Sequence, residues 1–170
     1  MIYSTPRYMP KKQALPRGPI DSPERRRLPP LLRRAWYGLN QAFRRRIAHL
    51  GLTPDQFTVM RTLLEHHGPT QRELAQLISS DPNTVASLVN RMECAGLLER
   101  VPHGRDRRAN QLRLKAQGRA RYERARKIAV ALQSEVLSVL PAHDREIFLV
   151  QLDRLAEACR GAALDSPGRG

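Results

Sequence analysis

The chain has 170 residues, which suits one domain of ordinary size and is too short for two large ones. Its formal net charge of +14 and isoelectric point near 11.2 indicate a polyanionic partner. Only Cys94 and Cys159 are present, without the spacing of a disulfide framework or zinc cluster, so we expect a reducing, cytoplasmic location. No apolar run suits a membrane span, and we expect no cofactor and no metal. The sequence has no Gly-rich phosphate loop, nucleophile elbow or His-Glu-x-x-His spacing, so we expect no enzyme.

The N-terminal part divides into an arm and a helix. Residues 1–28 combine prolines with scattered Lys and Arg and have no periodicity, which predicts a disordered basic arm. Such an arm adds at most weak, nonspecific attraction to phosphates. Residues 29–52, introduced by Pro29 and Pro30, are predicted to form an N-terminal dimerisation helix. Its apolar residues recur at helical spacing: Leu32, Ala35, Trp36, Leu39, Phe43, Ile47 and Leu50.

Two capping boxes mark the starts of the next helices. Thr53 and Gln56 form a Thr-x-x-Gln box with Pro54 at the first helical position, and this helix is expected to end at Gly68 and Pro69 after burying Phe57, Met60, Leu63 and Leu64. Thr70 and Glu73 form a second box, Thr-x-x-Glu. The short helix that it begins is expected to bury Leu74, Leu77 and Ile78.

A second short helix follows a tight turn. Asp81 and Pro82 suit its N-cap and first helical position, and Gly96 suits a left-handed stop. At about 100° per residue, one arc of this helix is apolar and consists of Val85, Leu88, Val89 and Met92. The opposite arc consists of Asn83, Thr84, Ser87, Asn90 and Arg91. Hydrogen-bonding side chains on a rigid helix are what the reading of bases in a major groove requires, although a solvated helix face is the plainer alternative.

A basic hairpin is predicted after this helix. Residues 97–101 and 111–115 suit two short strands with Leu112 and Leu114 pointing inward, and the loop between them includes Arg105, Arg107 and Arg108. Arginines at a hairpin tip can lie along phosphates or enter a minor groove. The alternative is a loop that charge keeps soluble. The segment therefore predicts a winged helix-turn-helix DNA-binding domain over residues 53–115, in a mainly α fold with a two-stranded β-wing.

The C-terminal part predicts assembly. Residues 116–162 are expected to form C-terminal dimerisation helices, one over residues 116–140 and one over residues 143–160, with Pro141 between them and a disordered tail over residues 163–170. Such helices carry more apolar surface than one winged-helix core covers. A two-fold homodimer would bury that surface. The alternative is that these helices fold back on their own core.

The sequence from about Leu31 to Cys159 resembles the MarR family of bacterial transcriptional regulators. The segments that carry the resemblance are LTPDQFTVMRTL, TQRELAQLI, NRMECAGLLER, and the wing Asp106-Arg107-Arg108 before QLRLKAQG. The resemblance implies a dimer that binds double-stranded DNA at a pseudo-palindromic promoter site. It also implies a repressor that is released by a small, frequently phenolic or anionic effector. Trp36 with nearby arginines is one candidate lining for such a pocket, although a single Trp on an apolar helical face is more often a core residue.

The resemblance also implies roles for single residues. Arg108 is expected to contact DNA from the wing while Asp106 orients it, and the helix over residues 82–95 is expected to read the major groove. The complete set of predicted DNA-binding residues is Gln71, Arg72, Asn83, Thr84, Ser87, Asn90, Arg91, Arg105, Asp106, Arg107 and Arg108. Lys115 departs from the family, which commonly has Thr there as the cap of the long helix.

Two further readings stay open. A winged-helix module that meets protein or RNA would present the same polar helix face, but aromatic residues make up only 5% of the chain, which offers few stacking surfaces for RNA. Cys94 lies on the polar side of its helix near Arg91, so it is either a redox-sensitive thiol or an unreactive cysteine at a helix end.

Overall fold

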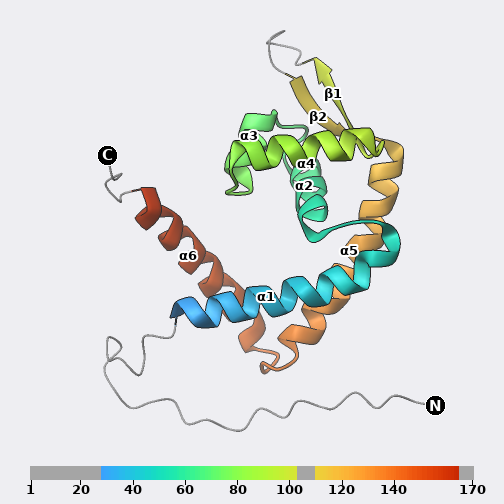
Figure 1. Cartoon of the computed structure of the whole chain (residues 1–170). Helices are drawn as coiled ribbons and strands as arrows, with labels where there is room; N and C mark the ends of the chain where they lie inside the picture. The colour runs from blue at the N-terminus through green and yellow to red at the C-terminus, as the bar shows by residue number, and fades with distance from the viewer. Residues whose placement is uncertain (1–27, 103–109, 165–170) are drawn as a thin grey trace, which may run out of the picture. The chain divides into compact units, whose positions relative to one another are not determined.

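The computed structural model describes residues 28–102 and 110–164. Most of the predicted basic arm, the tip of the predicted wing and most of the predicted tail lie outside these ranges. The described elements are helices α1 (Leu28–Ile47), η1 (Ala48–Leu50), α2 (Pro54–Glu65), α3 (Gln71–Leu77) and α4 (Pro82–Cys94), strands β1 (Leu98–Pro102) and β2 (Asn110–Leu114), and helices α5 (Ala116–Leu137) and α6 (Asp144–Leu164) (Figure 1). The described residues divide into two compact units, one up to Gln41 and one from Ala42 onward. None of the described helices is long and apolar enough to cross a membrane.

The capping signals in the sequence begin α2 and α3 as predicted. The Thr53 hydroxyl accepts the Gln56 backbone N–H at 3.2 Å, and the Gln56 side chain accepts the Thr53 backbone N–H at 3.0 Å. The same reciprocal pair forms between Thr70 and Glu73. Each box satisfies two N–H groups that have no partner inside the helix, so both helices begin where local chemistry requires.

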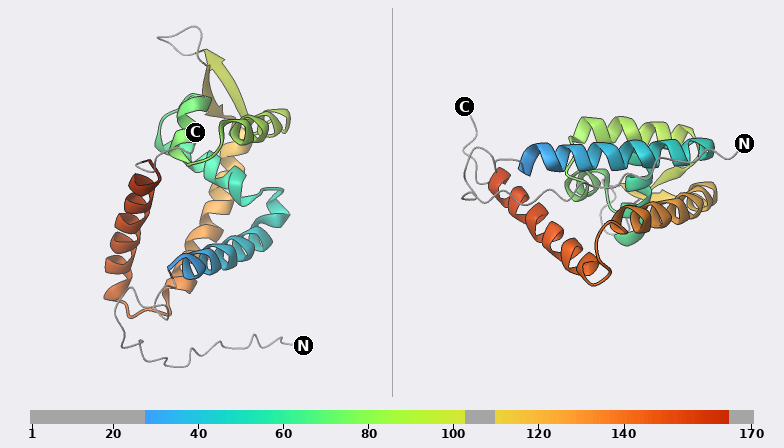
Figure 2. Two further views of the ribbon diagram at one scale, coloured as in Figure 1. Left: turned by 60° about the vertical axis from the view of Figure 1, so that its left-hand side comes forward. Right: turned by 90° about the horizontal axis from the view of Figure 1, so that it is seen from below.

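The core of the second unit forms where α2, α3, α4 and the strands meet (Figures 1 and 2). The predicted apolar arc of α4 is confirmed, because Val85, Leu88, Val89 and Met92 are all buried. Phe57 of α2 packs between Phe43 and Tyr122, with ring centroids 4.9 and 5.3 Å away. The core therefore joins the end of α1 and the first half of α5 to the helix-turn-helix.

Two details of the sequence prediction were wrong. Leu77 was expected in the core but is 45% exposed, because α3 ends at this residue and its buried positions are Leu74 and Ala75. Helix α1 begins at Leu28, one residue before the predicted range, and ends at Ile47. Pro29 and Pro30 fit its first turn because the N–H groups that proline lacks have no helical partner there.

Strands β1 and β2 form the predicted antiparallel hairpin, shifted by one residue from the predicted ranges. Leu98 pairs with Leu114 and Arg100 pairs with Leu112 in its register. Helix α5 then begins at Ala116, although the Lys115 side chain makes no capping hydrogen bond. The Lys115 backbone N–H instead donates to the Leu97 carbonyl at 3.0 Å, which ties the start of α5 to the strand entry.

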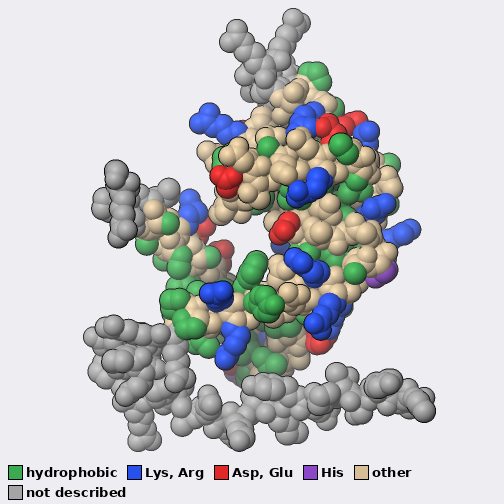
Figure 3. Space-filling view, in the orientation of Figure 1, with side chains coloured by type: hydrophobic (Ala, Val, Ile, Leu, Met, Phe, Trp, Pro, Cys, Tyr) green, Lys and Arg blue, Asp and Glu red, His purple; other side chains and the backbone are tan. Residues whose placement is uncertain are grey.

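One chain leaves much apolar surface uncovered on its flanking helices. None of the described side chains of α6 is buried, and Ile147, Phe148 and Val150 are each more than 40% exposed. In α1, Trp36 is 64% exposed and Tyr37 is 59% exposed. Hydrophobic side chains accordingly show on the surface in Figure 3. This pattern agrees with the expectation that these helices have more apolar surface than one core covers.

Gly118 permits the closest approach between α5 and the rest of the second unit. A Cβ built at Gly118 would lie 2.0 Å from the Leu97 carbonyl oxygen, a distance at which the backbone must move. The same carbonyl accepts the N–H of Lys115, so the contact is fixed from two directions. Gly118 thus sets how near the first turn of α5 lies to the turn between α4 and β1.

Replacing Gly118 with Ala should destabilise the protein by about 2 kcal/mol or more, in the range of overpacked cores. Gly161→Ala is the matched control, because a Cβ at this helical glycine meets nothing within 4 Å in one chain. That variant should gain stability by about 0.5 kcal/mol from helix propensity. Chemical denaturation of both variants measures the difference, and equal stabilities would contradict the close-approach argument.

Candidate nucleic-acid interface

Helix α4 has one face in the core and one in solvent. Val85, Val89 and Met92 are 0% exposed, so the rotation of the helix about its axis is fixed by packing. The predicted reading face is exposed at all five positions: Asn83, Thr84, Ser87, Asn90 and Arg91. The structure therefore presents short polar side chains and one cation on a rigid helix.

Asp81 holds the first turn of this face in place. Its carboxylate accepts the backbone N–H groups of Asn83 at 2.9 Å and Thr84 at 3.0 Å. Because Asn83 and Thr84 are also the first two residues of the exposed polar face, the cap orders the end of the helix where that face begins. Pro82 follows the cap, as the sequence predicted.

Two of the predicted DNA-contacting residues form a hydrogen bond within α4. The Arg91 Nη1 donates to the Ser87 Oγ at 3.0 Å, one helical turn apart. The hydroxyl thus helps to place the guanidinium along the helix surface. A change at Ser87 would remove a hydrogen-bonding group and also release Arg91.

An arginine that is not among the predicted DNA-binding residues lies at the junction of α3, α4 and β1. Arg100 contacts the Glu93 carboxylate through its Nη1, and its Nη2 donates to the amide oxygens of Asn90 at 2.6 Å and Gln71 at 3.1 Å. The Arg100 backbone N–H also donates to Glu93 at 3.2 Å. Only 27% of the Arg100 side chain is exposed, so it is a partly buried cation with three side-chain partners.

The sequence does contain a signal for this cluster. Side chains along a strand alternate between its two faces, so Arg100 lies on the same face as Leu98, and it also pairs in register with buried Leu112. A charged residue on the inward face of a strand needs a partner. What the sequence does not reveal is that its partners come from α3 and α4, because those contacts are set by tertiary packing.

The remaining predicted residues have different positions. Gln71 and Arg72 are in the first turn of α3, where Gln71 is half-buried and Arg72 is exposed. The predicted wing residues lie outside the described residues, and they are Arg105, Asp106, Arg107 and Arg108. Cys94 is exposed at the C-terminal end of α4.

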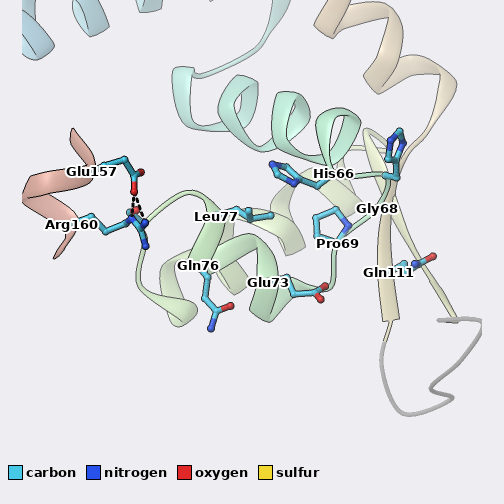
Figure 4. Close-up of a pocket in the computed structure, with 11 residues that line it drawn as sticks. His66, Gly68, Pro69, Glu73, Gln76, Leu77, Gln111, Glu157 and Arg160 are labelled. Atoms are coloured by element: carbon cyan, nitrogen blue, oxygen red, sulfur yellow. Dashed lines mark hydrogen bonds and ion pairs between the residues drawn. The ribbon is translucent and has the colours of Figure 1, made fainter. Parts of the chain in front are cut away.

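A cavity of about 750 Å³ lies between the α2–α3 connection and α6 (Figure 4). His66 and Pro69 line it on one side, and Glu157 and Arg160 line it on the α6 side. The hydrogen bond from Arg160, and then its charge, hold the pKa of the Glu157 carboxyl below its ordinary value. The same pair raises the pKa of Arg160, so both side chains are ionised at neutral pH.

Among the described residues, no group of three or more His, Cys, Asp and Glu side chains is placed to hold a metal ion.

Comparison with known proteins identifies the family. The MarR family model matches residues 52–109. The transcriptional regulator HosA of Escherichia coli O157:H7 is 32% identical over 129 residues, which cover 73% of this chain and 95% of HosA. The match to HosA thus extends beyond the helix-turn-helix and wing into the flanking helices.

Solved structures share the fold. The transcriptional repressor CouR, bound to a 23-mer DNA duplex, is 30% identical with a TM-score of 0.68, over 74% of this chain and 89% of CouR. The organohalide-sensing regulator RdhR, in a form bound to 2,4-dichlorophenol, is 19% identical with a TM-score of 0.71, over 86% of this chain and 89% of RdhR. That second likeness concerns the fold alone. With the match to HosA, these findings show that the chain belongs to the MarR family of DNA-binding transcriptional regulators, which are not enzymes.

Proposed function

We propose that the protein is a dimeric, cytoplasmic repressor that occupies a pseudo-palindromic promoter site and leaves it when a small ligand binds. The observation that carries this proposal is the α4 surface, which is buried on one side and polar on the other. CouR, a repressor 30% identical to this chain, was solved on duplex DNA, which supports the same use of the fold here.

We assign the reading of bases to α4 and the contacts with phosphates to the wing and the basic arm. Asn83, Thr84, Ser87, Asn90 and Arg91 would enter the major groove, because their side chains can exchange hydrogen bonds with base edges. Gln71 and Arg72 would approach from the start of α3. Wing residues Arg105, Arg107 and Arg108, with Asp106 orienting Arg108, would contact phosphates and the minor groove, and the basic arm would add charge without sequence preference.

We divide the chain accordingly into an arm (1–28), an N-terminal dimerisation helix (29–52), a DNA-binding domain (53–115), C-terminal dimerisation helices (116–162) and a tail (163–170). The exposed apolar side chains of α6 support the assignment of that helix to dimerisation, since the described residues of one chain leave them uncovered.

Substitutions in α4 and substitutions in the wing should weaken DNA binding in different ways. Ser87→Ala or Asn90→Ala should reduce the difference in binding free energy between operator and random DNA by about 1 to 3 kcal/mol, because each removes contacts to base edges. Arg108→Ala should weaken operator and random DNA alike and reduce the salt slope by about 0.9, because a phosphate contact releases counterions. Titrations on both duplexes across a salt series measure these effects. Equal losses on the two duplexes for the α4 variants would exclude α4 as the reading helix.

Dimerisation can be tested through α6. Removing residues 141–170, or replacing exposed Phe148 with Glu, should yield monomers in sedimentation and a sharp loss of operator affinity, because one half-site retains only its own contacts. Glu146→Lys in the first turn of the same helix is a control for a changed charge. A Phe148→Glu protein that stays dimeric would mean that the dimer is built without this face.

The dimer also sets the geometry of the operator. Two-fold partners should contact half-sites about 10 to 10.5 base pairs apart, or a multiple of that spacing. Inserting five base pairs turns one half-site to the opposite side of the duplex. Tight binding to the altered duplex would argue against a rigid two-fold dimer.

We further propose that the cavity beside α6 takes a small phenolic or anionic effector. Its volume is in the range of known ligand sites, and RdhR shows that a regulator of this fold can bind a phenol. An anionic ligand would compete with Glu157 for Arg160, which are paired in Figure 4.

With benzoate as the anionic probe and phenol as the neutral one, Glu157→Gln should strengthen release of DNA by benzoate and leave the effect of phenol unchanged. Arg160→Ala should abolish the benzoate effect. Fluorescence anisotropy of a labelled operator measures release, and identical benzoate responses in wild type and both variants would place the effector elsewhere.

A further inference from the structure

Arg100 joins the two helices of the helix-turn-helix to the root of the wing. Through one guanidinium it contacts Gln71 of α3, Asn90 and Glu93 of α4, and it lies in β1 itself. Gln71 and Asn90 were both predicted to contact DNA. The cluster of Arg100 with Gln71, Asn90 and Glu93, called the clamp below, therefore holds two candidate DNA-contacting residues from the protein side. Arg100 is partly buried, with its charge met by Glu93.

The chemistry of guanidinium decides which end of each amide faces Arg100. A guanidinium has only N–H donors and no acceptor, so it can bond only to the oxygen of a carboxamide. The Oδ1 of Asn90 and the Oε1 of Gln71 are the atoms that receive it. In a planar amide the NH₂ group then points away from the guanidinium. Both side chains are thus turned so that their donor ends face away from Arg100.

We propose that Arg100 is a positioning residue for DNA recognition: it fixes the amides of Asn90 and Gln71 so that they act as hydrogen-bond donors to the duplex. This inference rests on the proposed function, in which α4 enters the major groove. A free asparagine can both donate and accept, and it commonly pairs with the N6 and N7 of adenine. With its oxygen held by a cation at 2.6 Å, Asn90 is restricted mainly to donating.

The restriction predicts the class of base that Asn90 selects. The acceptors in the major groove are N7 and O6 of guanine, N7 of adenine and O4 of thymine, whereas cytosine presents an N4 amino donor. An Asn90 restricted mainly to donating is therefore expected to disfavour cytosine at its contact position. Gln71, at the start of α3 and only half-exposed, would present its donor to a phosphate or base at the edge of the site.

Arginine is required because one cation serves several acceptors in a fixed plane. Lysine has a single ammonium nitrogen on a flexible stem and cannot reproduce the fork that contacts Glu93 with Nη1 while Nη2 bonds Asn90 and Gln71. Glu93 in turn contacts Nη1 of the same guanidinium and meets its charge. Weakening the contact between Glu93 and Arg100 should therefore change DNA recognition through the position of Arg100.

The experiment compares Arg100→Met, Arg100→Lys and Glu93→Gln with a matched control, Arg113→Met. Arg113 lies on β2, is exposed and pairs in register with Glu99, so its loss removes the same charge from the same hairpin without touching the clamp. Selection from a random duplex pool gives the base preference of each full-length variant. Thermal melting and total DNA affinity separate a loss of discrimination from a loss of folding or charge.

We expect Arg100→Met to lower discrimination against cytosine at the Asn90 position by roughly tenfold, the scale of one specific base contact. Arg100→Lys should recover little of it, Glu93→Gln should show a smaller loss, and Arg113→Met should leave the base profile unchanged. Adding Arg100→Met to Asn90→Ala should cost no further discrimination at that position. If Arg100→Met does not fold, Glu93→Gln and Arg100→Lys carry the same prediction.

The outcomes separate this inference from the function on which it rests. A wild-type protein that selects no sequence would overturn both. A wild-type protein that selects an operator, with Arg100→Met and Glu93→Gln keeping its base profile as Arg113→Met does, would overturn only the positioning role. A profile in which Asn90→Ala and Arg100→Met lose preference at different positions would also overturn it.

Discussion

The structure depends on how firmly α4 is held on its apolar side. Val85, Val89 and Met92 have no exposed surface, so a rotation of α4 would expose apolar area and open a cavity in the core. A polar helix face can be a reading surface only if its direction is fixed, because base contacts tolerate little displacement. The core packing under α4 is therefore part of recognition, although none of its residues would reach DNA.

The packing that holds α4 is also linked to the C-terminal helices, through the start of α5. The Leu97 carbonyl accepts the Lys115 N–H and lies so close to Gly118 that no side chain fits there. Phe57 stacks on Tyr122 of α5 and meets Phe43 at the end of α1. A movement of α5 would therefore disturb the DNA-binding core, because these contacts are closely packed. That coupling is the physical route by which events on the C-terminal helices could alter the spacing of two α4 helices in a dimer.

The sequence predicted features that depend on neighbours along the chain. The two capping boxes, the Asp81 cap, the apolar arc of α4 and the ranges of the two strands within one residue all follow from local chemistry or periodicity. The predicted burial of Leu77 was wrong, because helical periodicity does not show at which residue neighbouring elements stop covering a seven-residue helix. The Arg100 cluster was missed because its partners are 7, 10 and 29 residues away in sequence, and only the packed fold brings them together. The wing arginines stay a prediction.

The contacts of the polar face change how that face should be understood. On the helical wheel, Ser87, Asn90 and Arg91 are independent groups, but Ser87 bonds Arg91 and Asn90 bonds Arg100. Each of these bonds removes rotamer freedom before DNA arrives, which lowers the entropy cost of ordering long side chains on binding. Each also commits an oxygen that a free side chain could offer to a base. The face is thereby biased toward donating, as suits a surface that meets the acceptor-rich edges of purines and the phosphate oxygens beside them.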